Sequence, residues 1–207
     1  MPANDYHFVS HWRVPNASMR DVYDILADAT SLPRWWPALY LDVLEIQPGG
    51  TDQVDKVIRI AAKGGWLPYK LNWHFTVTDS DPPHGFGLKA WGDFDGTGRW
   101  TLTQEGAGVA ITYDWRIKAE KPLLKYTSAL FKPLFAVNHD WAMKKGEQSL
   151  RLEVLRRRAV TDAERAAVPA PPPPSPTLPA PALYGAAALL LLLFVRRRRR
   201  RRIRYVA

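Results

Sequence analysis

The chain contains no cysteine among its 207 residues. This absence excludes disulfide bonds, catalysis by a thiolate, and zinc or iron–sulfur sites with cysteine ligands. The first 14 residues also lack the uninterrupted apolar run of about 7–15 residues that an export signal requires. We therefore expect them to form a strand of the folded domain instead.

Long hydrophobic runs are scarce as well. The longest extends from Ala182 to Val195 and has 14 residues, whereas a helix that crosses a bilayer needs about 20. The run therefore predicts either a marginal span, helped by arginine snorkelling or local thinning of the bilayer, or an anchor that lies in the membrane interface.

Outside one segment, the chain lacks an excess of either charge. It has 29 lysines and arginines against 20 aspartates and glutamates, but without eight arginines near the C-terminus the balance is 21 to 20. The charge therefore belongs to a local tail, and we expect no specific nucleic-acid partner. The arginines expected to contact an anionic membrane surface are Arg196, Arg197, Arg198, Arg199, Arg200, Arg201, Arg202 and Arg204.

Composition divides the chain into four segments. Residues 1–158 have the mixed pattern of one folded domain, which we expect to bind a ligand. Residues 159–181 form a Pro/Ala-rich linker whose second half holds eight prolines, which predicts a semi-extended spacer without a core of its own. Residues 182–195 form the short apolar segment expected to associate with a membrane, and residues 196–207 form the Arg-rich tail.

The domain shows the alternation of apolar and polar residues that is typical of antiparallel strands. It is clearest from Tyr69 to Val77 and from Val109 to Ile117, where every second residue is apolar. About six such strands are expected after the first one. Turn-forming residues separate them, and we expect one of these turns at residues 95–98.

Helical patterns appear on both sides of these strands. Ser18, with Asp21 three residues later, indicates a capping box that starts a short helix, and residues 31–37 predict a second short helical or turn element. After Pro122, apolar residues recur at mostly three- and four-residue spacing as far as Val154. This spacing predicts a long C-terminal helix.

This order of elements resembles the SRPBCC superfamily, the START-like helix-grip proteins that include polyketide cyclase/dehydrase-like and lipid-transfer domains. The local matches are Leu32–Pro37 (LPRWWP) and the segment from Asn138 to Leu150 in the last helix. The resemblance implies an α+β helix-grip fold: a curved antiparallel sheet of about seven strands around a long C-terminal helix, with two short helices after the first strand. It also implies an apolar cavity between sheet and helix, but no particular activity.

Aromatic residues are abundant, with nine Trp, eight Tyr and seven Phe. Many share the inward-facing parity of their strands, which is consistent with either a solid aromatic core or the lining of a ligand cavity. The candidate lining residues are Leu71, Trp73, Phe75, Leu88, Ala90, Trp100, Leu102, Tyr113, Trp115, Asn138, Trp141 and Ala142. Because few polar residues accompany them, we expect a mostly apolar ligand with one or two polar groups.

The sequence shows no catalytic constellation. The five histidines lack the spacing of metal ligands, and Asp93 and Asp95 are better explained as turn residues than as an acid–base pair. We expect no metal and no cofactor. The only polar candidates inside a cavity, which serve either chemistry or structure, are Gln104, Tyr113, Asn138 and His139.

The sequence therefore favours binding or carriage of a hydrophobic small molecule, such as a lipid, an isoprenoid or a polyketide-like compound. One alternative is a polyketide cyclase/dehydrase-like enzyme that uses the same cavity, and another is a co-chaperone-type interaction module with a filled core. We expect the tail to hold the domain at the cytoplasmic face of a membrane. A single span with an external domain is the alternative if an export signal lies upstream, since the positive-inside rule keeps arginines cytoplasmic.

Overall fold

The computed structural model describes residues 4–176, apart from the side chains of residues 123, 126, 127 and 129–131 in the long helix. The predicted apolar segment 182–195 and the Arg-rich tail 196–207 lie outside the described residues, as do residues 177–181 of the linker. Within residues 4–176, no helix is both long enough and apolar enough to cross a membrane.

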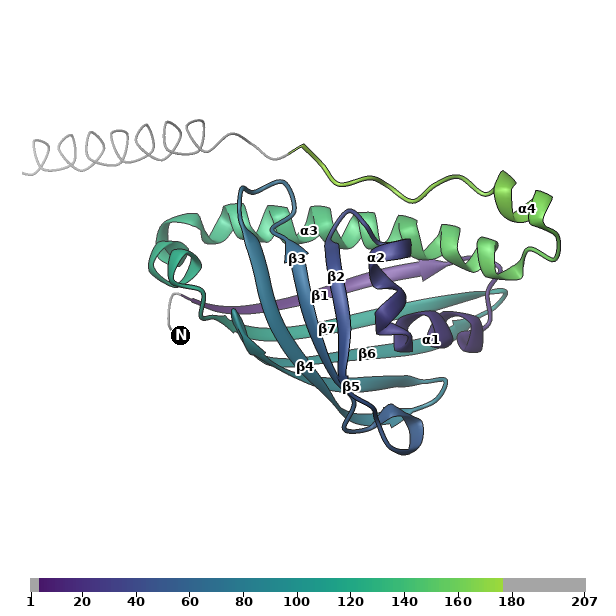
Figure 1. Cartoon of the computed structure of the whole chain (residues 1–207), viewed down its shortest axis with the longest axis horizontal. Coiled ribbons are helices and arrows are strands. Elements are labelled where there is room, and N and C mark those ends of the chain that lie inside the picture. Colours follow the sequence, from purple (N-terminus) through teal and green to yellow (C-terminus); the bar gives the residue numbers. More distant parts are fainter. Residues whose placement is uncertain (1–3, 177–207) are drawn as a thin grey trace, which may run out of the picture.

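Seven strands form one antiparallel sheet in the order β1-β7-β6-β5-β4-β3-β2. The strands are β1 (Asp5–Val14), β2 (Tyr40–Gln47), β3 (Val57–Lys63), β4 (Lys70–Asp81), β5 (Gly85–Gly92), β6 (Phe94–Glu105) and β7 (Gly108–Ala119). The helices are α1 (Met19–Ala27), α2 (Leu32–Trp35), α3 (Pro122–Arg158) and α4 (Asp162–Ala167), with 3₁₀ turns η1 (Ala29–Ser31) and η2 (Thr51–Gln53). The sheet curves beneath α3, which lies lengthwise across it (Figure 1). The predicted helix-grip fold is confirmed.

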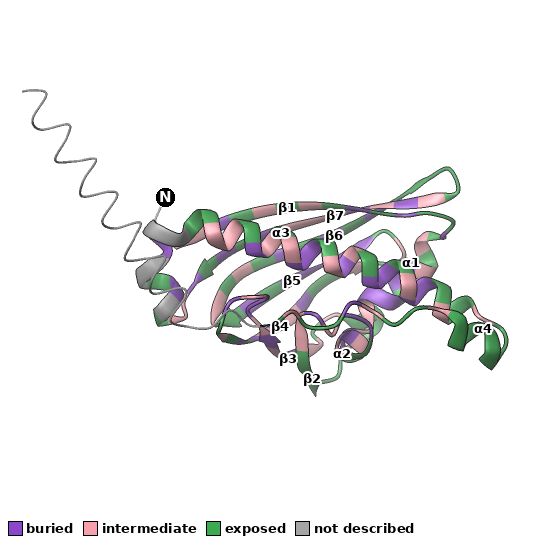
Figure 2. Ribbon diagram, turned by 90° about the horizontal axis from the view of Figure 1, so that it is seen from above, coloured by how far each residue is buried: buried purple, intermediate pink, exposed green. Residues whose placement is uncertain are grey.

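The capping box at Ser18 starts α1 as predicted. The Ser18 hydroxyl accepts a hydrogen bond from the Asp21 amide at 3.2 Å, and an Asp21 carboxylate oxygen accepts one from the Ser18 amide at 3.0 Å. These bonds satisfy two backbone donors at the helix end that otherwise lack partners. The helix buries Val22, Ile25 and Leu26 in the core beside α3. Among the described side chains of α3, most of the buried ones lie in the half of this helix that passes α1 (Figure 2).

The turn predicted at residues 95–98 is wrong, because these residues belong to β6. Gly96 pairs with Ile117 and Gly98 pairs with Trp115, and the chain reverses earlier, between Gly92 and Phe94. A methyl group at Gly98 would lie 2.7 Å from the Trp115 ring. Gly98 therefore leaves room for the Trp115 ring over β6, whereas a side chain at Gly96 would collide with the backbone of Arg116 in β7. Both are roles of strand glycines other than turn formation.

The middle of α3 approaches the segment after α2 closely. A Cβ atom at Gly146 would lie 2.3 Å from the Trp36 ring, so this glycine makes room for Trp36. Further along α3, the buried Glu153 carboxylate accepts hydrogen bonds from Arg34 at 2.7 Å and Arg157 at 2.9 Å. Burial alone raises the pKa of Glu153, but these arginine bonds lower it below its usual value. The ion cluster fastens α2 to α3.

Part of the proline-rich half of the predicted linker packs on the domain. We refer to residues 169–176, which follow α4, as the proline strap. Arg156 donates a hydrogen bond to the Pro169 carbonyl at 2.8 Å, and Lys63 donates one to the Ser175 carbonyl at 2.5 Å. Pro172 between them is buried. The strap therefore runs back over the domain from α4 toward β3 (Figures 1 and 2).

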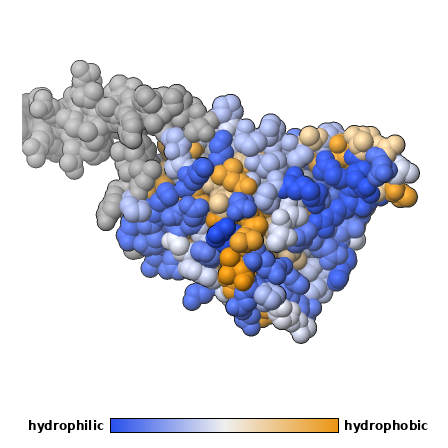
Figure 3. Space-filling model, viewed as in Figure 1, coloured by the Kyte–Doolittle hydropathy of each residue, from blue (hydrophilic) through white to orange (hydrophobic). Residues whose placement is uncertain are grey.

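The outer face carries a narrow apolar strip. Figure 3 shows it running down the molecule over the region of β2 and β3. The exposed apolar residues of β2 are Leu41, Leu44 and Ile46. Because β2 is an edge strand of the sheet, this strip lies beside unpaired backbone groups.

Candidate ligand-binding cavity

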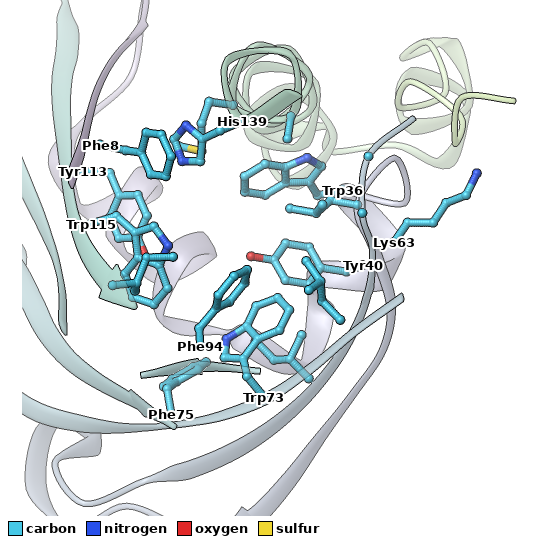
Figure 4. A pocket seen from close by; sticks show the side chains of 18 of the residues that line it. Phe8, Trp36, Tyr40, Lys63, Trp73, Phe75, Phe94, Tyr113, Trp115 and His139 are labelled. Carbon is cyan, nitrogen blue, oxygen red and sulfur yellow. The ribbon is translucent and has the colours of Figure 1, made fainter. Parts of the chain in front are cut away.

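A cavity of about 180 Å³ lies between α3 and the concave face of the sheet. Residues of all seven strands form its walls, although β2 contributes only Tyr40. The residues around α2 and the helix α3 complete them. The β3–β4 loop closes one side with Gly64 and Gly65. Figure 4 shows aromatic side chains from several strands converging on this space.

Nine of the twelve candidate residues border the cavity: Leu71, Trp73, Phe75, Leu88, Trp100, Tyr113, Trp115, Asn138 and Ala142. Ala90, Leu102 and Trp141 do not. Ala90 is fully buried within the sheet face, and Leu102 pairs with Ile111 in the solid part of the core. Trp141 packs partly buried against the core from α3. Ligand binding by the nine residues stays a prediction.

Several lining residues were not predicted from the sequence. They lie in loops or at strand ends, where period-two alternation gives no signal. These residues are Trp36, Tyr40, Lys63 and Phe94. Tyr6, Phe8 and Tyr69 also border the cavity, and the alternating patterns that contain them were the signal that could have placed them there.

The aromatic walls form contiguous ring contacts. Tyr113 stacks on Trp100 with ring centroids 4.1 Å apart and on Trp115 at 5.6 Å. Trp73 meets Phe94 edge to face at 5.5 Å. Because rings held by neighbouring rings have few alternative rotamers, the cavity is largely pre-formed.

His139 of α3 faces this cavity as a neutral group. Its ring stacks on Phe8 with centroids 4.0 Å apart, and Figure 4 shows the two rings side by side. Burial lowers the pKa of His139 to about 4, although the nearby Asp140 carboxylate acts in the opposite direction. Its buried Nδ1 atom has no hydrogen-bond partner among the described residues.

Asn138 connects α3 to the β3–β4 loop. It is 9% exposed, and its Oδ1 atom accepts a hydrogen bond from the Trp66 amide at 3.3 Å. A side chain at Gly65 would collide with the same oxygen. Asn138 therefore fixes the loop that closes one side of the cavity.

Gln104, the remaining polar candidate, does not border the cavity. Its side-chain amide donates to the carbonyls of Ala17, Gly106 and Gly108 at 3.0–3.1 Å. The residue holds the β6–β7 turn against the start of α1. The prediction that Gln104 faces inward is therefore wrong, because the backbone carbonyls at this strand end attract the amide.

Charged groups are kept at the edge of the cavity. Lys63 borders it, but Figure 4 shows its ammonium pointing away from the aromatic rings, toward the carbonyl of Ser175. Asp93 accepts hydrogen bonds from the Asn72 amide at 2.8 Å and from Lys121 at 3.0 Å, a structural role. In the part of the chain that the structure describes, no three His, Cys, Asp or Glu residues gather in a way that could hold a metal ion.

A long helix held in a seven-stranded antiparallel sheet, over a cavity lined by aromatic rings, defines a helix-grip protein of the START-like class. Residues 7–158 match the family described as polyketide cyclase / dehydrase and lipid transport, and the chain belongs to this family. No curated protein shows significant sequence similarity to the chain.

Solved structures share this fold at low sequence identity. The protein TTHA0849 from Thermus thermophilus is 16% identical, with a TM-score of 0.61 over 74% of this chain and 100% of its own. The Zhui aromatase/cyclase from Streptomyces sp. R1128 is also 16% identical, with a TM-score of 0.56 over 75% and 97%. A START superfamily protein from Mycobacterium smegmatis is 11% identical, with a TM-score of 0.53 over 70% and 98%.

Proposed function

We propose that the protein binds and carries an uncharged hydrophobic small molecule in the cavity under α3. The observation that carries this proposal is the cavity of about 180 Å³ with walls of aromatic and aliphatic side chains. Burial of apolar ligand surface against such walls contributes roughly 25 cal/mol per Å². The membership of a family that includes lipid-transport proteins supports the same function.

The hydrocarbon fluorene, a rigid apolar probe, tests this function. Titration of the full chain with fluorene is expected to change the fluorescence of the tryptophans that border the cavity, with saturation at one site. The variant Ala142→Phe places a ring in the cavity and is expected to abolish binding. Val137→Phe is the matched control, since Val137 lies on the exposed side of the same helix. Equal binding by both variants would contradict a site in this cavity.

A cyclase- or dehydrase-like reaction in the same cavity is the second candidate. It is favoured by the inward position of His139, with its unpaired Nδ1 atom, and of Asn138. The compound that co-purifies with the protein would be released and incubated again with fresh protein. Loss of water from the compound with wild type, but not with His139→Phe, would support catalysis, and an unchanged compound would support carriage. The co-chaperone alternative has less support, because it predicted a filled core.

We further propose that residues 182–207 hold the domain at the cytoplasmic face of a membrane. The support is the short apolar run followed by eight arginines, because each arginine near an anionic surface contributes about 1 kcal/mol. Co-sedimentation of the full chain with vesicles of phosphatidylserine and phosphatidylcholine is expected. Replacement of the eight arginines by glutamine is expected to weaken it strongly. Equal binding to vesicles of phosphatidylcholine alone would contradict the electrostatic part.

A further inference from the structure

Two tyrosine hydroxyls in the cavity have no hydrogen-bond partner among the described residues. Tyr40 stands at the start of β2 and Tyr113 in the middle of β7, and both border the cavity. Figure 4 shows the Tyr40 hydroxyl pointing into the cavity toward the side on which Tyr113 and Trp115 lie. Among residues 4–176, no group hydrogen-bonds to either hydroxyl.

Two other buried tyrosines of the described residues have paired hydroxyls. Tyr6 donates to the Ser128 hydroxyl at 2.8 Å, and Tyr23 shares a hydrogen bond with the Ser80 hydroxyl at 2.6 Å. A hydroxyl that is removed from water without a partner costs free energy, so unpaired ones are uncommon in protein interiors. Tyr69 also borders the cavity, and its hydroxyl has no partner among the described residues. The tyrosine that acts on its pKa is Tyr6 rather than Tyr40 or Tyr113, so Tyr69 is not part of the same pair.

We propose that Tyr40 and Tyr113 form a two-point clamp for one uncharged oxygen atom, that of a ketone or an alcohol, in an otherwise apolar ligand. The inference rests on the proposed binding function and narrows its ligand class. Both phenols have a donor and an acceptor to offer, so a single ligand oxygen between them satisfies both hydroxyls. The surrounding rings would hold the hydrocarbon part of the ligand.

The chemistry of the walls excludes a charged ligand oxygen. Burial raises the pKa of Tyr40 and of Tyr113, and the neighbouring Tyr40 raises that of Tyr113 further, so both remain neutral. His139 is neutral above about pH 4, and the Lys63 ammonium points outward. A carboxylate in this space would lack a cation to offset its loss of hydration.

The pair 9-fluorenone and fluorene tests the clamp, because the two probes have nearly the same shape and differ by one ketone oxygen. Each would be titrated into the full chain by tryptophan fluorescence. Wild type is expected to bind the ketone about tenfold more tightly, the result of two hydrogen bonds of modest net strength. Tyr40→Phe and Tyr113→Phe are each expected to lose roughly threefold for the ketone alone. The double variant is expected to bind both probes equally.

Tyr23→Phe is the matched control, because it removes a hydroxyl that already has a partner at Ser80. It is expected to leave the ketone preference unchanged. Equal affinity of wild type for the two probes, or a preference that survives in the double variant, would overturn the clamp while leaving cavity binding intact. Failure of wild type to bind either probe would overturn the proposed binding function, and the clamp with it.

Discussion

At the scale of single residues, His139 and the cavity tyrosines are neutral polar groups in an apolar space. The ring of His139 is held against Phe8 by stacking, and burial keeps the imidazole uncharged. The tyrosine hydroxyls are similarly uncharged. Polarity without charge is therefore the feature that separates this cavity from both an ordinary apolar core and a site for ionic ligands.

The buried imidazole makes stability depend on pH. Because the folded pKa of about 4 lies below the usual value of 6.5, the unfolded chain binds more protons between these two values. Stability is therefore lost as pH falls through this window, by about 2 kcal/mol between pH 7 and pH 5. Urea unfolding at both pH values measures the loss. His139→Phe is expected to remove it, whereas His84→Phe, at an exposed site, is expected to retain it. An equal loss in both variants would contradict a buried neutral His139.

Gly98 has a steric role. The Gly98→Ala methyl group would lie 2.7 Å from the Trp115 ring, which must move into the cavity or the core. We expect the free energy of unfolding to fall by about 1–3 kcal/mol and fluorene binding to weaken. Gly50→Ala, where the nearest atom is 3.8 Å away, is the control and is expected to change stability by less than about 1 kcal/mol. Equal stability of the two variants, by chemical unfolding, would show that Trp115 is not confined there.

At the scale of elements, the proline strap is tied to the cavity edge by one lysine. Lys63→Met keeps the apolar stem but removes the hydrogen bond to the Ser175 carbonyl. Because the chain has no cysteine of its own, a nitroxide attached at Ser175→Cys reports strap motion alone. We expect the spin-label spectrum to sharpen with Lys63→Met and to stay broad with Lys70→Met, whose lysine is exposed on the paired strand. Equally sharp spectra in all forms would contradict a docked strap.

Elements with strong periodicity were predicted well. The capping box at Ser18 and the alternation from Tyr69 to Val77 depend only on near neighbours, and both lie where expected. The first half of β6 was missed, because Gly96 and Gly98 have the composition of a turn, whereas in the strand they leave room for the backbone of Arg116 and the ring of Trp115. The docking of the strap was also missed, since it depends on Lys63, which lies 112 residues from Ser175.

At the scale of the whole molecule, the fold could be predicted from the order of elements, and the cavity only in part. The inward parity of the strands placed seven candidates on the cavity wall, but it did not separate the wall from the solid core at Leu102. Residues at strand ends, such as Tyr40 and Lys63, reach the cavity through the curvature of the sheet, which no local pattern encodes. The near-neutral domain and its lining of uncharged groups support one account, in which the body of the protein holds a neutral apolar molecule.

Native mass spectrometry of the gently purified full chain tests that central claim most directly. The account predicts a population heavier than the polypeptide by the mass of one small molecule, which is released on denaturation and is uncharged and oxygen-containing. The same population should be missing from Ala142→Phe and present in Val137→Phe. A chain that carries no such molecule, and takes up neither fluorene nor 9-fluorenone when they are added, would contradict the account.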